Sequence, residues 1–235
     1  MKNPIKYSLQ TEIWPALILL AVVSLSLWAY PQLPAQVITH WNFYGQANGW
    51  SSREFHVFFF PALLVAMYIL FSVMPMFDPK SERYQEFARV YLIMRDLILL
   101  VFLVVFVVAT LVNLGYPINI GATVAGAVGL LMIILGNYFG KLKRNWFIGI
   151  RTPWTLSSEN VWNKTHRLGG RLFMFFGLSL ILAPWLAPTV ASVILIGGMI
   201  IMLAWINIYS YVLYKREKKE KKEENEGNGD QGALS

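Results

Sequence analysis

The chain has 235 residues, of which 56% are hydrophobic and 14% are charged, and its formal net charge is +7. A soluble domain of this length would carry roughly a quarter charged residues, so the composition excludes an ordinary soluble domain and predicts a membrane protein. The sequence contains no cysteine, which excludes disulfides, thiolate catalysts and zinc sites built on cysteine.

Long apolar runs indicate the fold class. A helix needs about 20 apolar residues to cross a bilayer, because the hydrocarbon offers no water to its backbone amides. The fifth of the runs below is short and is expected to extend back over residues 169–171. The runs predict an all-α membrane protein built as a six-transmembrane-helix bundle. They lie at residues 13–30, 57–77, 92–114, 118–139, 172–187 and 189–214.

The distribution of Lys and Arg predicts the orientation of this bundle. Short cytoplasmic loops retain these cations, and an N-terminus in the cytoplasm places all 20 of them inside except Arg53. Both termini are therefore expected in the cytoplasm. A cleaved signal peptide is the alternative for the first run, but that run is longer than the usual core of a signal peptide and no clear small-x-small cleavage site follows it.

The first outer loop, residues 31–56, predicts a small hairpin-like cap. Pro31 and Pro34 favour an extended start. The segment QVITHWNFY that follows has the character of a short strand, and Gly45 and Asn48-Gly49 supply turn signals. The polar and aromatic residues of this loop are candidates for a peptide-binding face. They are His40, Trp41, Asn42, Gly45 and Trp50, with His56 nearby.

Two alternatives apply to the same outer residues. An aromatic lid among lipid headgroups accounts for them equally well. A metal site at His40 and His56 is a weaker hypothesis, because Glu54 is the one acidic residue close by and the helical i, i+4 spacing of zinc ligands is missing. No metal or cofactor is expected.

The second distinctive segment covers residues 140–171. It is rich in Lys, Arg and Trp, and Glu159 is its single carboxylate. The Thr152-Pro153 bond and the glycines before it predict an irregular first part. Residues 157–168 predict a short amphipathic helix that lies on the inner leaflet and ends at Gly169.

Anchoring in an anionic leaflet explains these cations and tryptophans, at about 1 kcal/mol for each basic residue. It does not explain Asn145, Gly149 or Pro153, whose side chains contribute nothing to anchoring. A folded site is the alternative. In such a site Asp96 or Glu86 is expected to neutralise Arg151, since the third and fourth spans should be neighbours.

The residue order N-x-x-x-G-I-R-T-P-W-T-L-S-S-x-x-V-W-x-x-T-H-R-x-x-G in this segment resembles the signature of the SdpI family, integral-membrane immunity proteins of bacteria. The outer sequence HWNFYGQANGWSS looks like the short motif of a domain of unknown function that often precedes the SdpI domain. The resemblance implies a cytoplasmic partner site at the signature. Its residues are Asn145, Gly149, Arg151, Pro153, Trp154, Trp162 and His166.

The resemblance also implies a function and a location. Members of the family lie in the bacterial plasma membrane as multi-pass proteins and protect the producing cell against a secreted antimicrobial peptide. One member also holds a transcriptional repressor at the membrane. The partners implied are membrane lipids, a secreted peptide and a cytoplasmic repressor, without direct contact to nucleic acid.

Two other functions are weighed against immunity. One is a membrane sensor or structural subunit that docks a cytoplasmic protein and has no toxin. The other is a membrane-embedded enzyme using His40, His56 or His166, which the scarcity of acid-base groups argues against. No ionisable residue is expected deep in a span, so a coupled transporter is also disfavoured.

The chain is expected to divide into an N-terminal three-helix region (1–117), an SdpI-like domain (118–214) and a charged tail (215–235). The tail should begin as an extension of the last helix and become disordered. In the fourth span, small residues should let another helix approach closely. They are Gly121, Ala122, Ala125, Gly126 and Gly129.

The orientation can be tested with reporter fusions. A topology reporter fused after Arg53 should report a location outside the cell, and one fused after Lys143 a location inside, because nearly all cations then remain in the cytoplasm. The same side for both fusions would contradict the six-span topology.

Overall fold

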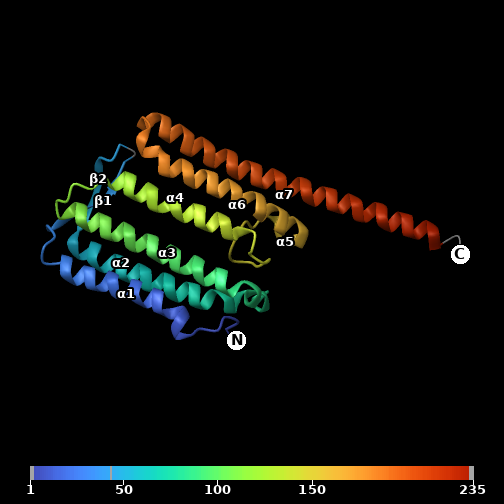
Figure 1. Ribbon diagram of the computed structural model, residues 1–235, viewed down its shortest axis with the longest axis horizontal. Helices are drawn as coiled ribbons and strands as arrows, with labels where there is room; N and C mark the ends of the chain where they lie inside the picture. The colour runs from blue at the N-terminus through green and yellow to red at the C-terminus, as the bar shows by residue number, and fades with distance from the viewer. Residues whose placement is uncertain (1–2, 43, 233–235) are drawn as a thin grey trace.

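The computed structural model describes residues 3–42 and 44–232 as a bundle of long helices with a small hairpin at one end (Figure 1). Within that described part, six helices are long and apolar enough to span a membrane, which confirms the predicted fold class. They are α1 (Leu9–Ala29), α2 (Arg53–Val73), α3 (Tyr84–Asn113), α4 (Ile120–Phe139), α6 (Glu159–Leu182) and α7 (Pro188–Gly232). The short helices are η1 (Met74–Phe77), η2 (Ser81–Arg83), α5 (Pro153–Ser157) and η3 (Ala183–Trp185).

The bundle has two halves that meet where α3 contacts α4 (Figure 1). In the first half, α1, α2 and α3 pack around four fully buried side chains, Val22, Leu64, Leu99 and Phe106. In the second half, α4 packs along α6, and α6 packs along α7. A cluster at one end of the bundle joins the halves; it includes Tyr84, Tyr91, Phe139, Leu142 and Trp162.

Glycines bring α4 and α6 into backbone contact. A Cβ atom added to Gly129 would lie 2.5 Å from the carbonyl oxygen of Gly177, and one added to Gly136 would lie 2.5 Å from that of Gly170. The predicted small face of the fourth span is thus used at Gly129, whereas a Cβ at Gly126 would meet open space. Close approach of this kind stabilises helix pairs in lipid, where packing replaces the hydrophobic effect.

The outer loop forms the predicted hairpin. Strands β1 (Gln36–Trp41) and β2 (Ala47–Ser52) pair antiparallel and lie at the opposite end of the bundle from α5 (Figure 1). Asn113, the last residue of α3, fixes β1: its Oδ1 accepts a hydrogen bond from the Ile38 amide at 2.7 Å, and its Nδ2 donates to the Ile38 carbonyl at 2.9 Å. We call this the hairpin end and the opposite end the loop end.

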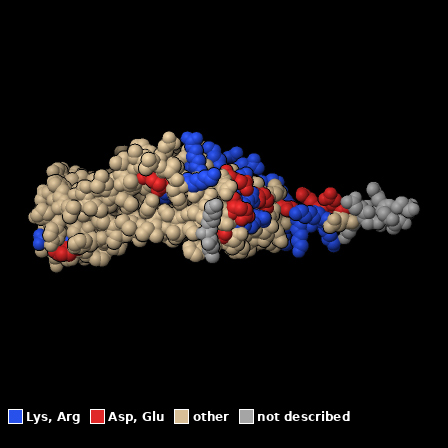
Figure 2. Space-filling view, turned by 90° about the horizontal axis from the view of Figure 1, so that it is seen from below, with Lys and Arg blue, Asp and Glu red and all other residues tan. Residues whose placement is uncertain are grey.

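Charge is distributed unevenly along the bundle. Figure 2 shows long uncharged stretches over the body of the molecule, with most Lys, Arg, Asp and Glu side chains gathered toward the end from which the C-terminal helix projects. This arrangement agrees with the predicted cytoplasmic location of the loop end, which stays a prediction.

The helix predicted over residues 157–168 does not end at Gly169. It is the beginning of α6, which continues to Leu182. Gly169 and Gly170 resemble a helix terminator in sequence, but here they provide space: a Cβ on Gly169 would collide with Ile150, and one on Gly170 with the backbone of Gly136. Because the residues that follow are apolar, the helix continues into the membrane region, where backbone amides need intrahelical partners.

The charged tail begins as the predicted extension of the last helix. Residues 215–232 continue α7, and residues 233–235 lie outside the described residues; the predicted disorder stays a prediction. Pairs at i, i+4 spacing support this extension, Lys221 with Glu217 at 2.8 Å and Lys219 with Glu223 at 3.5 Å.

The glycine contact can be tested by adding one methyl group. Gly129→Ala should lower the free energy of unfolding by about 1–3 kcal/mol, because the new Cβ forces α4 away from α6. Gly126→Ala is the matched control on the same helix and should be neutral or slightly stabilising. The measurement is thermal or denaturant unfolding of the purified protein in detergent, and equal stability of the two variants would contradict the close contact.

Candidate functional site

The signature loop, residues 140–158, is organised by the side chain of Asn145. Asn145 is fully buried, and its Oδ1 accepts hydrogen bonds from the amides of Phe147 (2.9 Å) and Ile148 (2.7 Å). Its Nδ2 donates to the carbonyls of Lys143 (2.8 Å) and Ile148 (3.0 Å). The Asn145 side chain thus bonds two backbone amides and two backbone carbonyls that have no helical partner. Only a side-chain amide can do this, because it carries both an acceptor and a donor group.

A buried carboxylate from outside the signature braces the same turn. Asp78 follows η1, and its Oδ2 accepts hydrogen bonds from the Trp146 amide (2.9 Å) and the Tyr84 hydroxyl (3.0 Å). Its Oδ1 accepts from the Lys80 amide at 2.8 Å. Sequence analysis missed Asp78 and Tyr84. The available signal was weak, an aspartate before Pro79 in the loop between two spans.

His166 closes the loop from α6. Gly149 has φ +112°, and a Cβ there would collide with Nε2 of His166, so only glycine fits. The Ile150 amide donates to this Nε2 at 2.9 Å, so the ring proton is on Nδ1, which donates to the Trp162 carbonyl at 2.9 Å. Both ring nitrogens are occupied in structural bonds, which leaves neither for acid-base chemistry.

Trp162 lies beneath this turn and is fully buried. Its ring stacks on His166 with centroids 4.0 Å apart, and its Nε1 donates to the Leu142 carbonyl at 2.8 Å. The indole therefore joins the end of α4 to the beginning of α6. This is a packing role, different from membrane anchoring.

Pro153 begins α5, and its neighbours Thr152 and Trp154 contact α7. Thr152 caps α5, because its hydroxyl accepts from the Thr155 amide at 3.1 Å, and proline fits the first helical position that follows. The Thr152 and Ser210 hydroxyls lie 3.1 Å apart. The ring of Trp154 packs on that of Tyr211 with centroids 5.1 Å apart.

Arg151 does not pair with either acid that we expected. It is exposed, and its Nη1 donates to the Trp146 carbonyl at 2.6 Å. Asp96 instead bonds Arg95 on the side of α3 that faces α1, and Glu86 bonds Arg83. Arg151 and the half-exposed Trp146 thus form the outward-facing part of the loop.

An ion pair links the loop to the start of α6, which also pairs with η2, and a hydrogen bond links the loop to α7. Arg83 donates two hydrogen bonds to the Glu159 carboxylate, from Nη1 at 2.5 Å and from Nη2 at 3.1 Å. Nε of Arg144 lies 3.6 Å from the same carboxylate. Ser158 donates to Glu217 of α7 at 2.6 Å. Burial, reinforced by the cations Arg144 and Arg83, lowers the pKa of Lys80 below its usual value.

At the hairpin end, the predicted peptide-facing residues take three different positions. His40 and Trp50 are exposed, Trp50 to 57%. Asn42 and Gly45 shape the turn: Asn42 Oδ1 accepts from the amides of Tyr44 (2.9 Å) and Gln46 (3.0 Å), and Gly45 has φ +74°. Trp41 is half-buried and packs against a cluster formed by α3 and α4.

His56 lies away from this face. It is buried in α2, and its Nε2 is 3.0 Å from the Thr110 hydroxyl of α3. His40 instead contacts Asn48, with its Nδ1 2.6 Å from the Asn48 Oδ1. The structure therefore does not bring the two histidines together as metal ligands.

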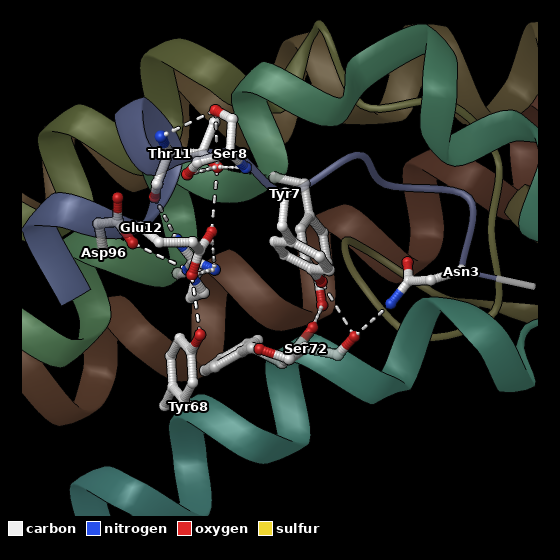
Figure 3. Close-up of polar contacts among 11 residues, drawn as sticks. Asn3, Tyr7, Ser8, Thr11, Glu12, Tyr68, Ser72 and Asp96 are labelled. Atoms are coloured by element: carbon white, nitrogen blue, oxygen red, sulfur yellow. Dashed lines mark hydrogen bonds and ion pairs between the residues drawn. The ribbon is translucent and has the colours of Figure 1, made fainter. Parts of the chain in front are cut away.

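A polar cluster lies where the first turn of α1, which contains Glu12, packs against α3. It lies at the end of α1, so the expectation that no ionisable residue is deep in a span stays a prediction. Arg95 is fully buried and bonds Glu12 and Asp96, while the Tyr68 hydroxyl donates to Glu12 at 2.8 Å (Figure 3). The sequence predicted Arg95 only as one of the cytoplasmic cations. Its position near the start of an apolar run did not show that it faces α1.

Comparison with known proteins supports the resemblance seen in the motifs. Residues 141–210 match the SdpI/YfhL protein family, and residues 17–65 match a domain of unknown function, DUF1648. The chain is 24% identical over 191 residues to Immunity protein SdpI of Bacillus subtilis (strain 168), a similarity that covers 81% of this chain and 89% of that protein. No solved structure matches.

Proposed function

Because the chain belongs to the SdpI family, we propose that it is an immunity protein of the bacterial plasma membrane that protects the cell against a secreted antimicrobial peptide. The observation that carries this proposal is the similarity to an immunity protein over most of the chain, together with the folded signature loop. The six apolar helices support the multi-pass location.

The hairpin is the surface that we assign to the peptide. It is the part of the outer end with polar and aromatic side chains together, and Trp50 presents a large exposed ring beside Ile38, its partner across the strands. Trp and Tyr supply contact area at low entropic cost and commonly dominate binding energy. Trp41, Asn42 and Gly45 hold the hairpin in shape, and His40 adds a hydrogen-bonding group.

The signature loop is the surface that we assign to a cytoplasmic partner such as a repressor. Its exposed part combines Arg151, Trp146 and Lys141, with the half-buried Lys143 beside them. Asn145, Trp162 and His166 form the buried support, and Gly149 packs against His166. An acidic or amphipathic partner fits this charge and aromatic content. A sensor that docks such a partner without toxin immunity is the competing function, and it predicts recruitment without protection.

The peptide surface is tested by Trp50→Ala. We expect roughly a tenfold or larger drop in the peptide concentration that an expressing cell survives, the loss typical of an aromatic anchor at an interface. Trp185→Ala is the matched control, since Trp185 is exposed to 77% at the same end but outside the hairpin. Survival is measured at equal membrane abundance, with peptides encoded in the same genome. Full protection by Trp50→Ala would leave the hairpin as a lid.

The partner surface is tested by Arg151→Lys. The guanidinium of Arg151 bonds the Trp146 carbonyl with one nitrogen and keeps its other donors for a partner, a planar fork that an ammonium does not reproduce. Protection or repressor recruitment should therefore fall about tenfold. Lys141→Arg is the control that preserves charge at a position without such a fork. Equal, full activity of both variants would indicate simple electrostatic anchoring.

A further inference from the structure

The cluster around Arg95 carries an unbalanced charge. Arg95 donates from Nη1 to both oxygens of Glu12 at 3.1 Å, from Nη2 to the Thr11 carbonyl at 2.9 Å, and from Nε to Oδ1 of Asp96 at 2.8 Å (Figure 3). One guanidinium thus serves two carboxylates. In the described residues no other cation bonds either of them, so the formal charge of this group of three is −1.

Of the two carboxylates, Asp96 is the one that can accept a further hydrogen bond or ion pair. Glu12 accepts hydrogen bonds from Tyr68 and Thr11 in addition to Arg95, whereas in the described part of the chain Oδ2 of Asp96 accepts none. Asp96 keeps 21% of its side chain exposed and lines a groove of about 430 Å³ on the outside of α1 and α3. The apolar residues of this groove are Trp14, Leu17, Ile18, Ile93, Leu97, Leu100 and Leu103.

A matching cation lies on another helix of the same chain. Arg171 on α6 is exposed, and among residues 3–42 and 44–232 it has no ion-pair partner. It begins a ridge at helical spacing, followed by Phe175 (70% exposed), Leu178 (47%) and Leu182 (52%). The ridge is exposed and apolar with one cation, and the groove is apolar with one anion.

The two charges lie at similar levels in the bundle. Gly170, next to Arg171, contacts the backbone of Gly136, and Phe139 of α4 packs in one cluster with Leu92 of α3. Asp96 is one helical turn beyond Leu92, about 6 Å along the axis, which is within the reach of an arginine side chain. Within one chain they cannot meet, because α4 lies between α3 and α6 (Figure 1).

We propose that two copies of this chain associate in the membrane, with Arg171 of one copy paired with Asp96 of the other and the Phe175 ridge lying in the α1/α3 groove. Ionisable groups within a membrane generally pair with one another, and helix contacts there depend on packing and polar bonds. The contact joins two different surfaces, so a closed dimer forms if it is made twice, and a ring forms if it is made once for each copy.

The absence of cysteine in this chain permits a direct crosslinking test. Leu100→Cys and Phe175→Cys are introduced into two differently tagged full-length copies, which are co-expressed and treated with a mild oxidant or a short bismaleimide. We expect a crosslinked product that carries both tags. Ile200→Cys is the control partner, because Ile200 is exposed to 60% on α7 and lies near the level of Phe176, which contacts Gly198. A yield no higher than that control would overturn the proposal.

Charge variants test the ion pair in the same assay. Arg171→Gln should reduce the Leu100–Phe175 crosslink at least fivefold, Arg171→Lys should retain most of it, and Arg167→Gln, an exposed cation one turn earlier on α6, should leave it unchanged. Because Arg171 is exposed, its loss should not impair folding. Asp96→Asn should reduce the crosslink as Arg171→Gln does. An unchanged yield with Arg171→Gln would refute the pairing.

A lipid is the other possible occupant of the groove, and varying the lipid composition distinguishes it from a second copy of the chain. Purified protein is placed in bilayers with or without phosphatidylethanolamine, whose amine could bond Asp96, and its mass is measured. A dimer or ring in both bilayers that is lost in Arg171→Gln supports the proposal. A monomer whose stability depends on phosphatidylethanolamine through Asp96 would instead assign the groove to a lipid and overturn it, as would a monomer in both bilayers.

Discussion

The non-helical backbone of residues 143–152 depends on buried side chains for its hydrogen bonds, and the rest of the loop end follows from this dependence. Asn145, Asp78 and His166 satisfy its amides and carbonyls, each of which would cost about 1–3 kcal/mol if left buried without a partner. Two of these three residues come from other elements, the segment before α3 and the helix α6. The loop can therefore adopt this conformation only when the two halves of the bundle are assembled around it.

The helix α3 is the element that touches both proposed surfaces. Its first residue, Tyr84, bonds Asp78 beneath the signature loop, and its last, Asn113, bonds both backbone groups of Ile38 in the hairpin. Coupling between distant sites travels through packed, contiguous elements that have two arrangements. The backbone of α3 is non-helical at Phe87 (φ −134°, ψ 22°), and both Phe87 and Tyr84 are buried in the cluster that joins the two halves.

The sequence predicted what depends on local pattern and missed what depends on contacts between elements. Six apolar runs and the turn residues near Gly45 were sufficient for the spans and the hairpin, because hydrophobicity and turn chemistry act locally. The sequence predicted a helix end at Gly169, since sequence alone does not distinguish a terminator from a position of close packing. Asp78, Tyr84 and Arg95 were missed because their roles arise only when distant segments meet. Such buried polar contacts leave no periodic signal.

The cations of the loop end fall into two groups according to the contacts they make. One group stabilises the folded structure, and the other is free to contact lipid. Arg83 and Arg144 hold Glu159 and so belong to the tertiary structure, while Lys164 and Arg167 are exposed on the first turns of α6. Exposed cations of the second kind suit an anionic lipid surface. Anchoring and a folded site are therefore not competing descriptions of one set of residues. Anchoring accounts for the composition of the segment. The buried hydrogen bonds of Asn145 and His166, with the close approach of Gly149 to His166, account for its specific residue order.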